Sequence, residues 1–556
     1  MRTAVVPDAG DGGWIQDLDA TGAPARPPRH LPHLRQYLAD VESRTAAPRW
    51  IVSETRRVYP AMLAAGLRLT RTWDVTLSEA VLLGAEGRGG EPPHVDAAYA
   101  RLRNLPVPPP PDLAPAARNT LFDTVPASDP KTELDTLVAV YRGQLRRTDD
   151  LPGSLKLLLA AESAGGLIAA EMTHHGLPWR RDIHDAILTD LIGPRPVKGM
   201  RPKRLQQLAD EVADRFGHPV NPDSPQQVIA AFRRAGHPVD STRAWELSEV
   251  AHPAVRPLLR YKELARIHSA HGWKWMSEWV TGDPDVGGRF RPEYVVGGVV
   301  TGRWATKGGG ALQIPRALRP ACHADPGWKL VVADASQLEP RVLAAMSGDH
   351  AMASAAGTDD LYAALAPTFG GHRDDAKIAL LSAMYGGTAG NANRLLTVMR
   401  RRFPQAWNHV EAAARVGETG GTVKTWLGRT CPPPPEKWWI MRSRDTRAVR
   451  DRGRFTRNFV VQGTAAEWAL AMMGYLRGRL HADHLGDLVF FQHDEVIVHS
   501  PVQHTDEVAH VVQQSADDAT RLLFGDTDVR IPLTTHVVDH YGQAGQDPHP
   551  ERLTSS

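Results

Sequence analysis

The sequence FFQHDEVIVHSP, residues 490–501, places His493, Asp494 and Glu495 between two apolar, β-prone runs. We expect a hairpin whose tip presents the two carboxylates, because strand-forming residues flank them on both sides. Adjacent ionised carboxylates repel each other, and their burial is costly unless positive charge compensates. Such a tip could bind Mg²⁺, which prefers oxygen ligands, or it could be a solvated acidic turn. A second carboxylate-bearing strand would favour metal binding.

A second strand of this kind is predicted at residues 330–334. The segment VVADASQLEPRVLAAMSGD, residues 331–349, begins with an apolar strand that ends on Asp334, and Glu339 then starts a helical pattern. Asp334 could cap that helix. Alternatively, two strands that each deliver one aspartate could hold two metal ions about 4 Å apart, as in-line phosphoryl transfer requires.

A third segment, GHRDDAKIALLSAMYGG at residues 371–387, lies between the two acidic strands. It places Arg373, Lys377, Leu381 and Tyr385 at successive i+4 steps, so these residues share one helix face. Two cations and an aromatic ring on one face suit a triphosphate and its attached base. A solvated basic helix face is the alternative if the segment is considered alone.

Together and in this order, the three segments resemble motif A, motif B and motif C of the family A DNA polymerases, the group that includes DNA polymerase I and its large fragment. The resemblance covers residues 151–545. It extends to TGRWATKGGGALQIP (301–315), RFTRNFVVQGTAAEWA (454–469), NPDSPQQV (221–228) and HPAVRPLLRYKELARIHS (252–269).

The resemblance implies a mixed α+β right-hand polymerase, with a shortened α/β, ribonuclease H-like exonuclease remnant at its N-terminus. We expect the exonuclease-like domain at 1–150, the polymerase domain at 151–545 and a tail at 546–556. Within the polymerase domain we expect a thumb at about 155–265, a palm at about 266–341 and 451–545, and helical fingers at about 342–450.

The resemblance also implies roles in catalysis. Asp334 and Asp494 would bind two Mg²⁺ ions, for which Mn²⁺ could substitute, and Glu495 would be a supporting carboxylate. Lys377 would act as a general acid toward pyrophosphate. The implied partners are primer–template DNA and deoxynucleoside triphosphates, with the chain acting as a monomer.

The implied nucleotide contacts come from motifs A, B and C. Arg373 and Lys377 would grip the triphosphate, and Tyr385 would close over the nascent base pair. Glu339, beneath the tyrosine, would exclude a 2′-hydroxyl and so select deoxynucleotides. His493 would lie near the primer terminus. Gln337 and Leu381 complete this predicted set.

The implied DNA contacts lie in the segments before motif A and after motif B. Arg303, Arg454 and Gln462 would donate to minor-groove acceptors, which all correct base pairs share. Gln313 and Asn458 belong to the same two segments.

The chain departs from the family pattern at three positions of these motifs. Ala335 stands where an aromatic residue is usual, Pro340 where an aliphatic residue is usual, and Leu381 where Phe or Tyr is usual. None of these changes removes a predicted metal ligand or phosphate-binding cation, so we still expect polymerase activity.

The N-terminal region lacks the acids of a 3′–5′ exonuclease. Residues 49–83 resemble the stretch around the second exonuclease motif, but Val58 occupies the position of its aspartate. Asp17 and Asp19 are the nearest upstream acids and lack an apolar lead-in, and no Tyr-x-x-x-Asp pattern occurs near Tyr141. We expect no proofreading and no preceding 5′-nuclease domain. A bifunctional exonuclease–polymerase and a non-catalytic primer–template binding factor remain the alternatives.

Composition is compatible with this interpretation without predicting it. A chain of 556 residues exceeds the usual single-domain size, and its formal charge of +2 says little about a local DNA-binding cleft. The two cysteines, Cys322 and Cys431, are too few for a zinc site. Arginine clusters suited to phosphate contacts occur at 195–204, 400–402 and 442–457.

We found no signal peptide and no apolar run long enough to span a membrane, and we expect a cytoplasmic, nucleoid-associated bacterial protein. The proline-rich stretch at 106–117 is interpreted as a stiff linker. The stretch CPPPPEKWW at 431–439 is interpreted as a rigid loop between fingers and palm.

Overall fold

The computed structural model describes residues 1–44, 46–110, 129–149, 151–282, 287–310, 313–386 and 392–545. The predicted tail and most of the predicted linker lie outside these residues. The chain divides into two compact units. The first comprises Met1–His174, Tyr294–Ala305 and Ala333–Thr535; the second comprises His175–Glu293, Thr306–Val332 and the residues from His536 onward.

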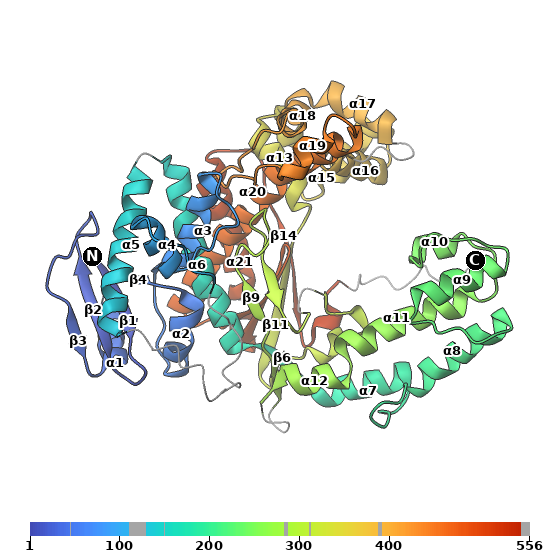
Figure 1. Cartoon of the computed structure of the whole chain (residues 1–556), viewed down its shortest axis with the longest axis horizontal. Coiled ribbons are helices and arrows are strands. Elements are labelled where there is room, and N and C mark those ends of the chain that lie inside the picture. The colour runs from blue at the N-terminus through green and yellow to red at the C-terminus, as the bar shows by residue number, and fades with distance from the viewer. Residues whose placement is uncertain are drawn as a thin grey trace. The chain divides into compact units, whose positions relative to one another are not determined.

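The first unit begins with a mixed five-stranded sheet (Figure 1). β1 pairs antiparallel with β2 and parallel with β4, which is itself parallel to β5. The sheet order is β3 (Arg29–Leu31), β2 (Gly13–Leu18), β1 (Arg2–Pro7), β4 (Arg49–Val52) and β5 (Thr72–Asp74). The helices of this region are α1 (Leu34–Glu42), α2 (Thr55–Ala64), α3 (Val75–Ala85), α4 (Val95–Leu102), α5 (Pro130–Asp149) and α6 (Gly153–His175).

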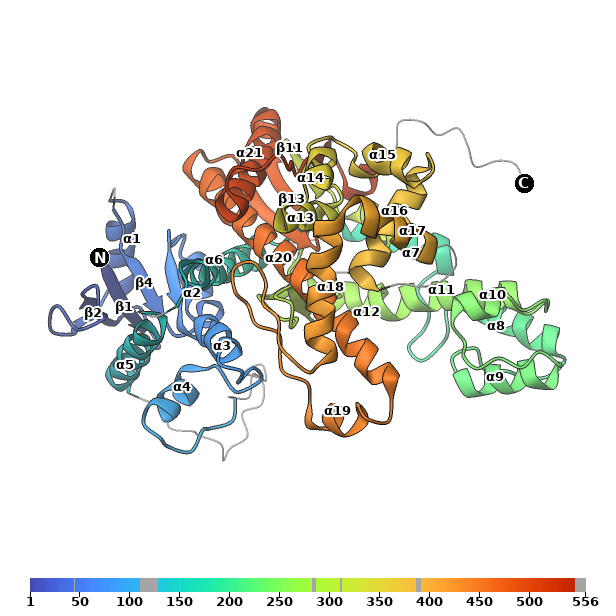
Figure 2. The same cartoon turned by 90° about the horizontal axis from the view of Figure 1, so that it is seen from above.

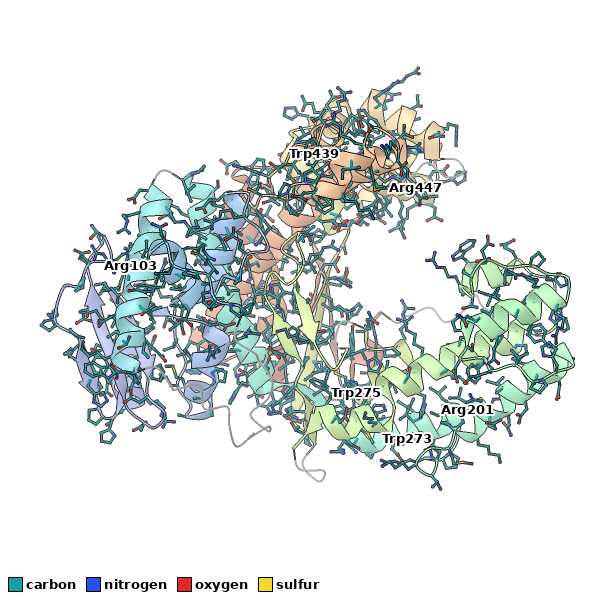
Figure 3. All side chains as sticks on the ribbon, viewed as in Figure 1. Arg103, Arg201, Trp273, Trp275, Trp439 and Arg447 are labelled. Carbon is teal, nitrogen blue, oxygen red and sulfur yellow. The ribbon has the colours of Figure 1, made fainter. Side chains whose placement is uncertain are left out.

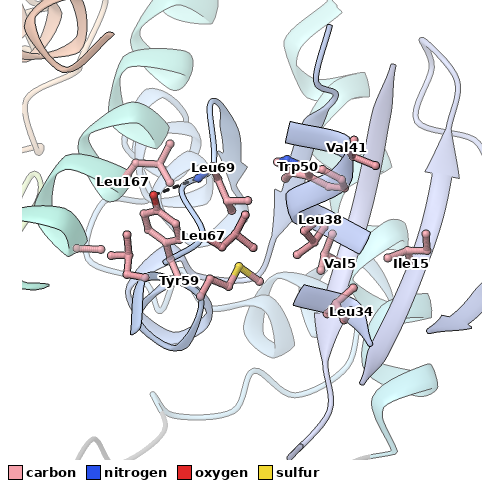
Figure 4. Close-up of a cluster of buried hydrophobic side chains, with 13 residues drawn as sticks. Val5, Ile15, Leu34, Leu38, Val41, Trp50, Tyr59, Leu67, Leu69 and Leu167 are labelled. Carbon is pink, nitrogen blue, oxygen red and sulfur yellow. Dashed lines mark hydrogen bonds between the residues drawn. The ribbon is translucent and has the colours of Figure 1, made fainter. Parts of the chain in front are cut away.

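A buried apolar cluster joins this sheet to the helices beside it (Figure 4). Ile15 and Trp50 from the strands pack in one cluster with Leu38 of α1, Tyr59 of α2 and Leu167 of α6. Each fully buried side chain of this size contributes about 1.5–3 kcal/mol to stability. Because α6 supplies part of this core, it is an integral element of the N-terminal region.

The helix α6 corrects one expectation from the sequence. It is the one helix among the described residues that is long and apolar enough to cross a membrane, judged by length and composition. However, 61% of its most apolar stretch is buried inside the structure. Its buried acids Glu162 and Glu171 accept hydrogen bonds from Arg429 and Arg477 respectively. These features are those of a core helix.

A second sheet carries the acidic hairpin. β12 and β13 pair antiparallel, and Gln492 lies opposite Glu495, so His493 and Asp494 form the tip as predicted. In this sheet, both hairpin strands and residues 333–335 and 533–535 belong to the first unit, and the rest of β11 and β14 belongs to the second. The order is β12 (Asp487–Gln492), β13 (Glu495–Pro501), β11 (Trp328–Ala335) and β14 (Leu533–Val538).

The region between β11 and β12 is helical, as the sequence predicts. Figure 2 shows α18 alongside the long helix α20, and the two helices are in contact. The elements are α13 (Leu338–Ser347), α14 (His350–Ala356), α15 (Leu361–Leu365), η3 (Ala366–Phe369), α16 (Arg373–Tyr385), α17 (Ala392–Arg402), α18 (Pro404–Glu418), α19 (Glu436–Met441) and α20 (Thr446–Ala482). η4 (Val502–His504) and α21 (Thr505–Phe524) follow the hairpin.

The short helix α19 was not predicted. The sequence indicated a rigid loop over residues 431–439, but a helix begins at Glu436, directly after Pro435. Proline cannot donate the hydrogen bond of an inner helical residue, and it is well tolerated just before or at a helix start. The prolines therefore end the loop, and the two tryptophans lie in the helix.

The second unit contains most of the predicted helical thumb. Its aromatic core includes Trp179, Trp275 and Phe290, whose ring centroids lie 4.8–5.8 Å apart. The helix α6, which the prediction assigned to the thumb, belongs to the first unit up to His174. The strands β9 (Glu293–Val295) and β10 (Ala305–Lys307) pair with each other, and the chain passes between the two units within each of them. The other elements of the second unit are β6 (Leu177–Trp179), α7 (Arg181–Ile192), α8 (Lys203–Phe216), α9 (Pro225–Arg234), α10 (Ala244–Ser248), α11 (Val255–His271), α12 (Trp273–Trp279), β7 (Val280–Thr281), β8 (Gly288–Phe290), η2 (Arg316–Ala321) and η5 (Tyr541–Gln543).

Candidate active site

Two aspartates that are distant in the sequence come from neighbouring strands. Asp334 lies near the end of β11, and Asp494 lies at the tip of the β12–β13 hairpin, beside β11 in the sheet. The backbone N–H of Ala335 donates to the carbonyl oxygen of Asp494 over 3.0 Å. His493 has a φ of +59°, a conformation uncommon for a residue with a side chain. The tight turn at the hairpin tip requires this conformation.

The two aspartates influence each other electrostatically. The pKa of Asp494 is raised to about 7, mainly by burial and also by the charges of Asp334 and Glu495, while Arg303 acts against them. Asp334 is exposed, whereas Asp494 and Glu495 are half-buried. A carboxylate whose pKa is raised by neighbouring carboxylates belongs to a donor set that a divalent cation would stabilise.

The described residues contain no group of three or more His, Cys, Asp or Glu side chains placed to hold a metal. Asp334 and Asp494 could therefore supply only part of a metal ion's ligand shell. Mg²⁺ commonly takes one or two carboxylates and completes its shell with water and substrate phosphates, and the pair suits that mode of binding.

The turn after Asp334 is fixed by side-chain hydrogen bonds. Gln337 has a φ of +58°. Its side chain accepts from the N–H of Leu361 over 2.9 Å and donates to a carboxylate oxygen of Asp360 over 2.9 Å. This turn also depends on Arg341, which is fully buried. The Arg341 guanidinium donates to the carbonyl oxygens of Ser336, Ala356, Thr358, Asp359 and Arg530.

Glu339 joins three of the predicted site residues. Its carboxylate accepts hydrogen bonds from the Arg303 guanidinium and from the Tyr385 hydroxyl. Arg303 precedes β11 in the sequence and Tyr385 ends α16, so the glutamate connects segments that are far apart in the chain. Sequence reasoning assigned Arg303 to the DNA minor groove and did not foresee this ion pair.

The helix α16 presents its predicted face. Arg373 and Lys377 are exposed, Leu381 and Tyr385 are half-buried, and the opposite face is buried. Gly386, with a φ of +68°, ends the helix in the left-handed conformation that favours glycine. The buried residues of the opposite face are Ala376, Ala379, Leu380, Ala383 and Met384.

Arg373 has two partners that the sequence did not reveal. Its Nε donates to a carboxylate oxygen of Asp360 over 2.8 Å, and its guanidinium lies 5.4 Å from the ring centroid of Tyr362. Asp360 also caps α15 by accepting from the N–H of Ala363 over 3.0 Å. Asp360 thus links the turn after Asp334, through Gln337, to the first cation of α16.

The helix α20 carries the three predicted DNA contacts of the second segment. Arg454 is exposed, and Asn458 and Gln462 are half-buried at successive i+4 steps of one face. The side-chain oxygen of Asn458 is buried without a hydrogen-bond partner. Gln313 belongs to the second unit, where it accepts from Arg266 over 3.3 Å.

The acids of the N-terminal sheet serve structural bonds. Asp17 accepts from the Thr3 hydroxyl over 3.0 Å, and Asp74 accepts from the N–H groups of Thr55 and Leu77 over 2.7 and 2.9 Å. Burial raises the pKa of Asp74 to about 6. Val58 packs against the apolar cluster of this region.

The fold of the chain is that of a polymerase domain. It is similar to a solved structure described as the POL domain of Pol1 from M. smegmatis in complex with DNA primer-template and dNTP. The TM-score is 0.71, at 17% sequence identity, and the match covers 97% of this chain and 95% of the other. This similarity confirms the predicted fold class.

The chain belongs to DNA polymerase family A, because the model of that family matches residues 198–543, more than half of the sequence. It is 25% identical to DNA polymerase I of Chloroflexus aurantiacus over 383 residues, which cover 60% of this chain and 38% of that protein. It is 27% identical to the thermostable DNA polymerase I of Thermus filiformis over 391 residues, or 62% and 44% of the two chains. The match therefore spans less than half the length of either relative.

Proposed function

We propose that this chain is a DNA-templated DNA polymerase that adds deoxynucleotides to a primer 3′ end. The observation that carries the proposal is the convergence of Asp334 and Asp494 on adjacent strands of a family A member. The cationic face of α16, which presents Arg373 and Lys377, supports it further. A family match alone would also fit a DNA-binding relative that has lost its carboxylates.

The two aspartates are the proposed ligands of two Mg²⁺ ions. When bound, such ions supply activation of the primer 3′-hydroxyl and stabilisation of the pyrophosphate leaving group. Asp334 and Asp494 fit this role because their carboxylates destabilise each other's charge without a cation. Glu495 adds negative charge beside them, and His493 lies at the hairpin tip where we place the primer terminus.

The cations of α16 are proposed to bind the triphosphate. Asp360 holds Nε of Arg373, which leaves the terminal nitrogens of the guanidinium to donate to phosphate oxygens. Lys377, one helical turn further along the same face, would neutralise charge and donate a proton to the departing pyrophosphate oxygen. Gln337 fixes the position of Asp360 and thereby orients the arginine.

The sugar and base pockets are proposed to form around Glu339. The bonds from Arg303 and Tyr385 hold its carboxylate in one position, where it would exclude a 2′-hydroxyl. From α16, Tyr385 would close over the nascent base pair and Leu381 would contact the sugar. Arg454, Asn458, Gln462 and Gln313 are the proposed minor-groove contacts.

We further propose that the chain does not proofread. A two-metal exonuclease needs several carboxylates around one point. The acids of the described N-terminal sheet are used for helix capping and ion pairs, and Val58 packs with the core where an acid would be needed. The proposed setting is bacterial DNA replication or repair in the cytoplasm, by a monomer.

Primer extension tests the polymerase proposal. The purified chain is mixed with a 5′-labelled primer–template, Mg²⁺ and one deoxynucleotide at a time. We expect addition of the templated nucleotide only, poor use of the matching ribonucleotide, and no product from Asp494→Asn. Extension that survives in Asp494→Asn at the wild-type rate would refute the assignment of this residue.

The same labelled primer tests the second proposal. Incubated with the chain and Mg²⁺ in the absence of nucleotides, it should keep its length. Progressive shortening from the 3′ end would show that the chain has exonuclease activity, provided that Asp494→Asn, prepared identically, shortens it too and so excludes pyrophosphorolysis.

A further inference from the structure

The helix α19 and the first turns of α20 form an exposed surface that is both aromatic and basic. Trp439 is 46% exposed and Ile440 is 66% exposed, although both are large apolar residues. Trp439 and Arg447 project from these two segments in Figure 3. We call this the Trp439 surface; it comprises Trp439, Ile440, Arg442, Arg444, Arg447 and Arg450, which are all exposed.

The indole of Trp439 is held in place from behind. The neighbouring Trp438 is buried, and its Nε1 donates to the carbonyl oxygen of Ala448 over 3.0 Å, which ties α19 to α20. The two indoles meet edge to face with centroids 5.0 Å apart. Gly420, with a φ of +89°, lies so close to the Trp439 indole that any side chain there would clash: a Cβ atom would be only 2.3 Å from the ring. A fixed, exposed ring loses little entropy when a ligand stacks on it.

The charge around this ring is positive. The Arg442 guanidinium lies 5.6 and 5.2 Å from the ring centroids of Trp438 and Trp439. Of the nearby acids, Asp445 caps α20 through the N–H of Arg447 over 2.7 Å, and Asp451 lies 3.8 Å from the Arg447 guanidinium. The exposed cations of residues 436–454 outnumber these acids and Glu436; they are Lys437, Arg442, Arg444, Arg447, Arg450 and Arg454.

The surface continues into the predicted DNA-binding face of α20. Arg447, Arg450 and Arg454 follow one another at i, i+3 and i+7, so they form one stripe on the helix. Asn458 lies one turn beyond Arg454 on the same stripe. A nucleic-acid strand that passes Asn458 and Arg454 would therefore meet Arg450 and Arg447 and then the rest of the Trp439 surface.

We propose that the Trp439 surface binds the unpaired template strand ahead of the primer terminus. Fixed aromatic rings on which bases stack, combined with cations that follow the phosphates, are the features of sequence-independent single-strand binding. A duplex would not expose base faces to Trp439, and a protein partner would not need the stripe of arginines. This inference rests on the proposed polymerase function for the direction of the strand.

Binding to primer–templates that differ only in their unpaired 5′ overhang tests the inference. The full chain is titrated against labelled duplexes with overhangs of about two and about fifteen nucleotides, a span that covers typical single-strand sites. We expect wild type to prefer the long overhang. Trp439→Ala should weaken binding to the long overhang by about fivefold or more, the effect of losing one stacked base, and should leave the short overhang unaffected. Trp439→Phe, which keeps a ring, should retain part of the preference.

A matched control exists on another part of the chain. Arg103 also lies over an aromatic ring, 5.4 Å from the centroid of Tyr99, and is exposed at the end of α4. Arg103→Ala should change neither affinity. The double variant Arg442→Ala/Arg444→Ala should make the affinity for the long overhang less dependent on salt. The slope of log affinity against log salt concentration should fall by the equivalent of about two phosphate contacts.

Equal wild-type affinity for both overhangs would overturn the inference, and so would a Trp439→Ala variant that weakens both complexes equally. Circular dichroism and the melting temperature show whether each variant is folded. If Trp439→Ala does not fold, Trp439→Phe serves as the test. Failure of the proposed function is seen separately, as a wild-type chain that adds no nucleotide to the short-overhang duplex while the binding comparison still holds.

Discussion

The carboxylates of Asp494, at the palm hairpin, and Asp74, in the N-terminal sheet, both have a raised pKa, and burial is the largest cause of each shift. Burial, with a small contribution from the charge of Glu54, raises the pKa of Asp74 to about 6, although its oxygens accept from two backbone N–H groups. The pKa of Asp494, about 7, is raised by burial and also by the charge of Asp334. A raised pKa therefore marks burial in both regions. Only the hairpin adds a second, exposed carboxylate that a metal could share.

The largest effect is expected when the shared pair is broken. Asp334→Asn should slow single-nucleotide addition by about a thousandfold or more, because the loss of a metal ligand removes several kcal/mol of transition-state stabilisation. Asp74→Asn should leave the rate per folded molecule unchanged. Single-turnover kinetics on one primer–template compare the two variants. Equal losses would show that the contrast between the two regions is mistaken.

The next effect concerns the buried ion pair that connects the N-terminal region to α20. Arg477 donates to Glu171 over 2.9 and 2.7 Å, and the Tyr59 hydroxyl donates to the same carboxylate over 2.6 Å. Arg477→Met leaves a buried carboxylate without its cation, and it should lower the free energy of unfolding by about 3–5 kcal/mol.

Urea unfolding measures this loss. Adding Glu171→Gln to Arg477→Met should restore part of the stability, because the uncompensated charge is then removed. If the free energy of unfolding of Arg477→Met lies within about 1 kcal/mol of the wild-type value, the N-terminal region does not depend on this pair.

The pH dependence of stability distinguishes Asp74. Its folded-state pKa of about 6 lies above the unfolded value, so folding takes up a proton between these two values. The contribution is fully present below about pH 3.8 and is lost as the pH rises through about 6. Between pH 4 and pH 7, wild type should lose about 2 kcal/mol of stability relative to Asp74→Asn. Denaturant unfolding of both proteins across that range checks this, and a constant difference would contradict it.

The smallest effect is expected at Asp360. Asp360→Asn keeps the size of the side chain but weakens its bond to Nε of Arg373, a half-exposed pair worth about 1 kcal/mol. The KM for the incoming nucleotide should rise about fivefold, with kcat little changed. Asp359→Asn is the matched control, since its side chain is 91% exposed and lies 4.0 Å from Arg530. Similar kinetics in both variants would remove Asp360 from the triphosphate site.

The elements that bear the predicted site could be foreseen from local patterns. Short apolar, β-prone runs located β11, β12 and β13, and the i+4 spacing located α16 from Arg373 to Tyr385. These patterns are local because each depends on the hydrogen bonds and burial of one element. The resemblance of ordered motifs then located the palm sheet, whose strands come from both sides of the helical region.

Contacts between distant segments could not be foreseen in this way. Arg341 contacts carbonyl groups of three separate stretches, and nothing in its local sequence sets it apart from an exposed arginine. Asp360 and Tyr362 contact Arg373 only because α15 folds against α16. The ion pair of Arg303 with Glu339 has the same origin.

Metal binding tests most directly whether Asp334 and Asp494 form a single centre. Mn²⁺ is titrated into the chain bound to a primer–template whose 3′-hydroxyl is absent, with the templated nucleotide present, and free Mn²⁺ is followed by electron paramagnetic resonance. Wild type should take up Mn²⁺ tightly, and Asp334→Asn and Asp494→Asn should each lose tight binding, while Asp74→Asn keeps it. Undiminished binding in either palm variant would contradict the shared site.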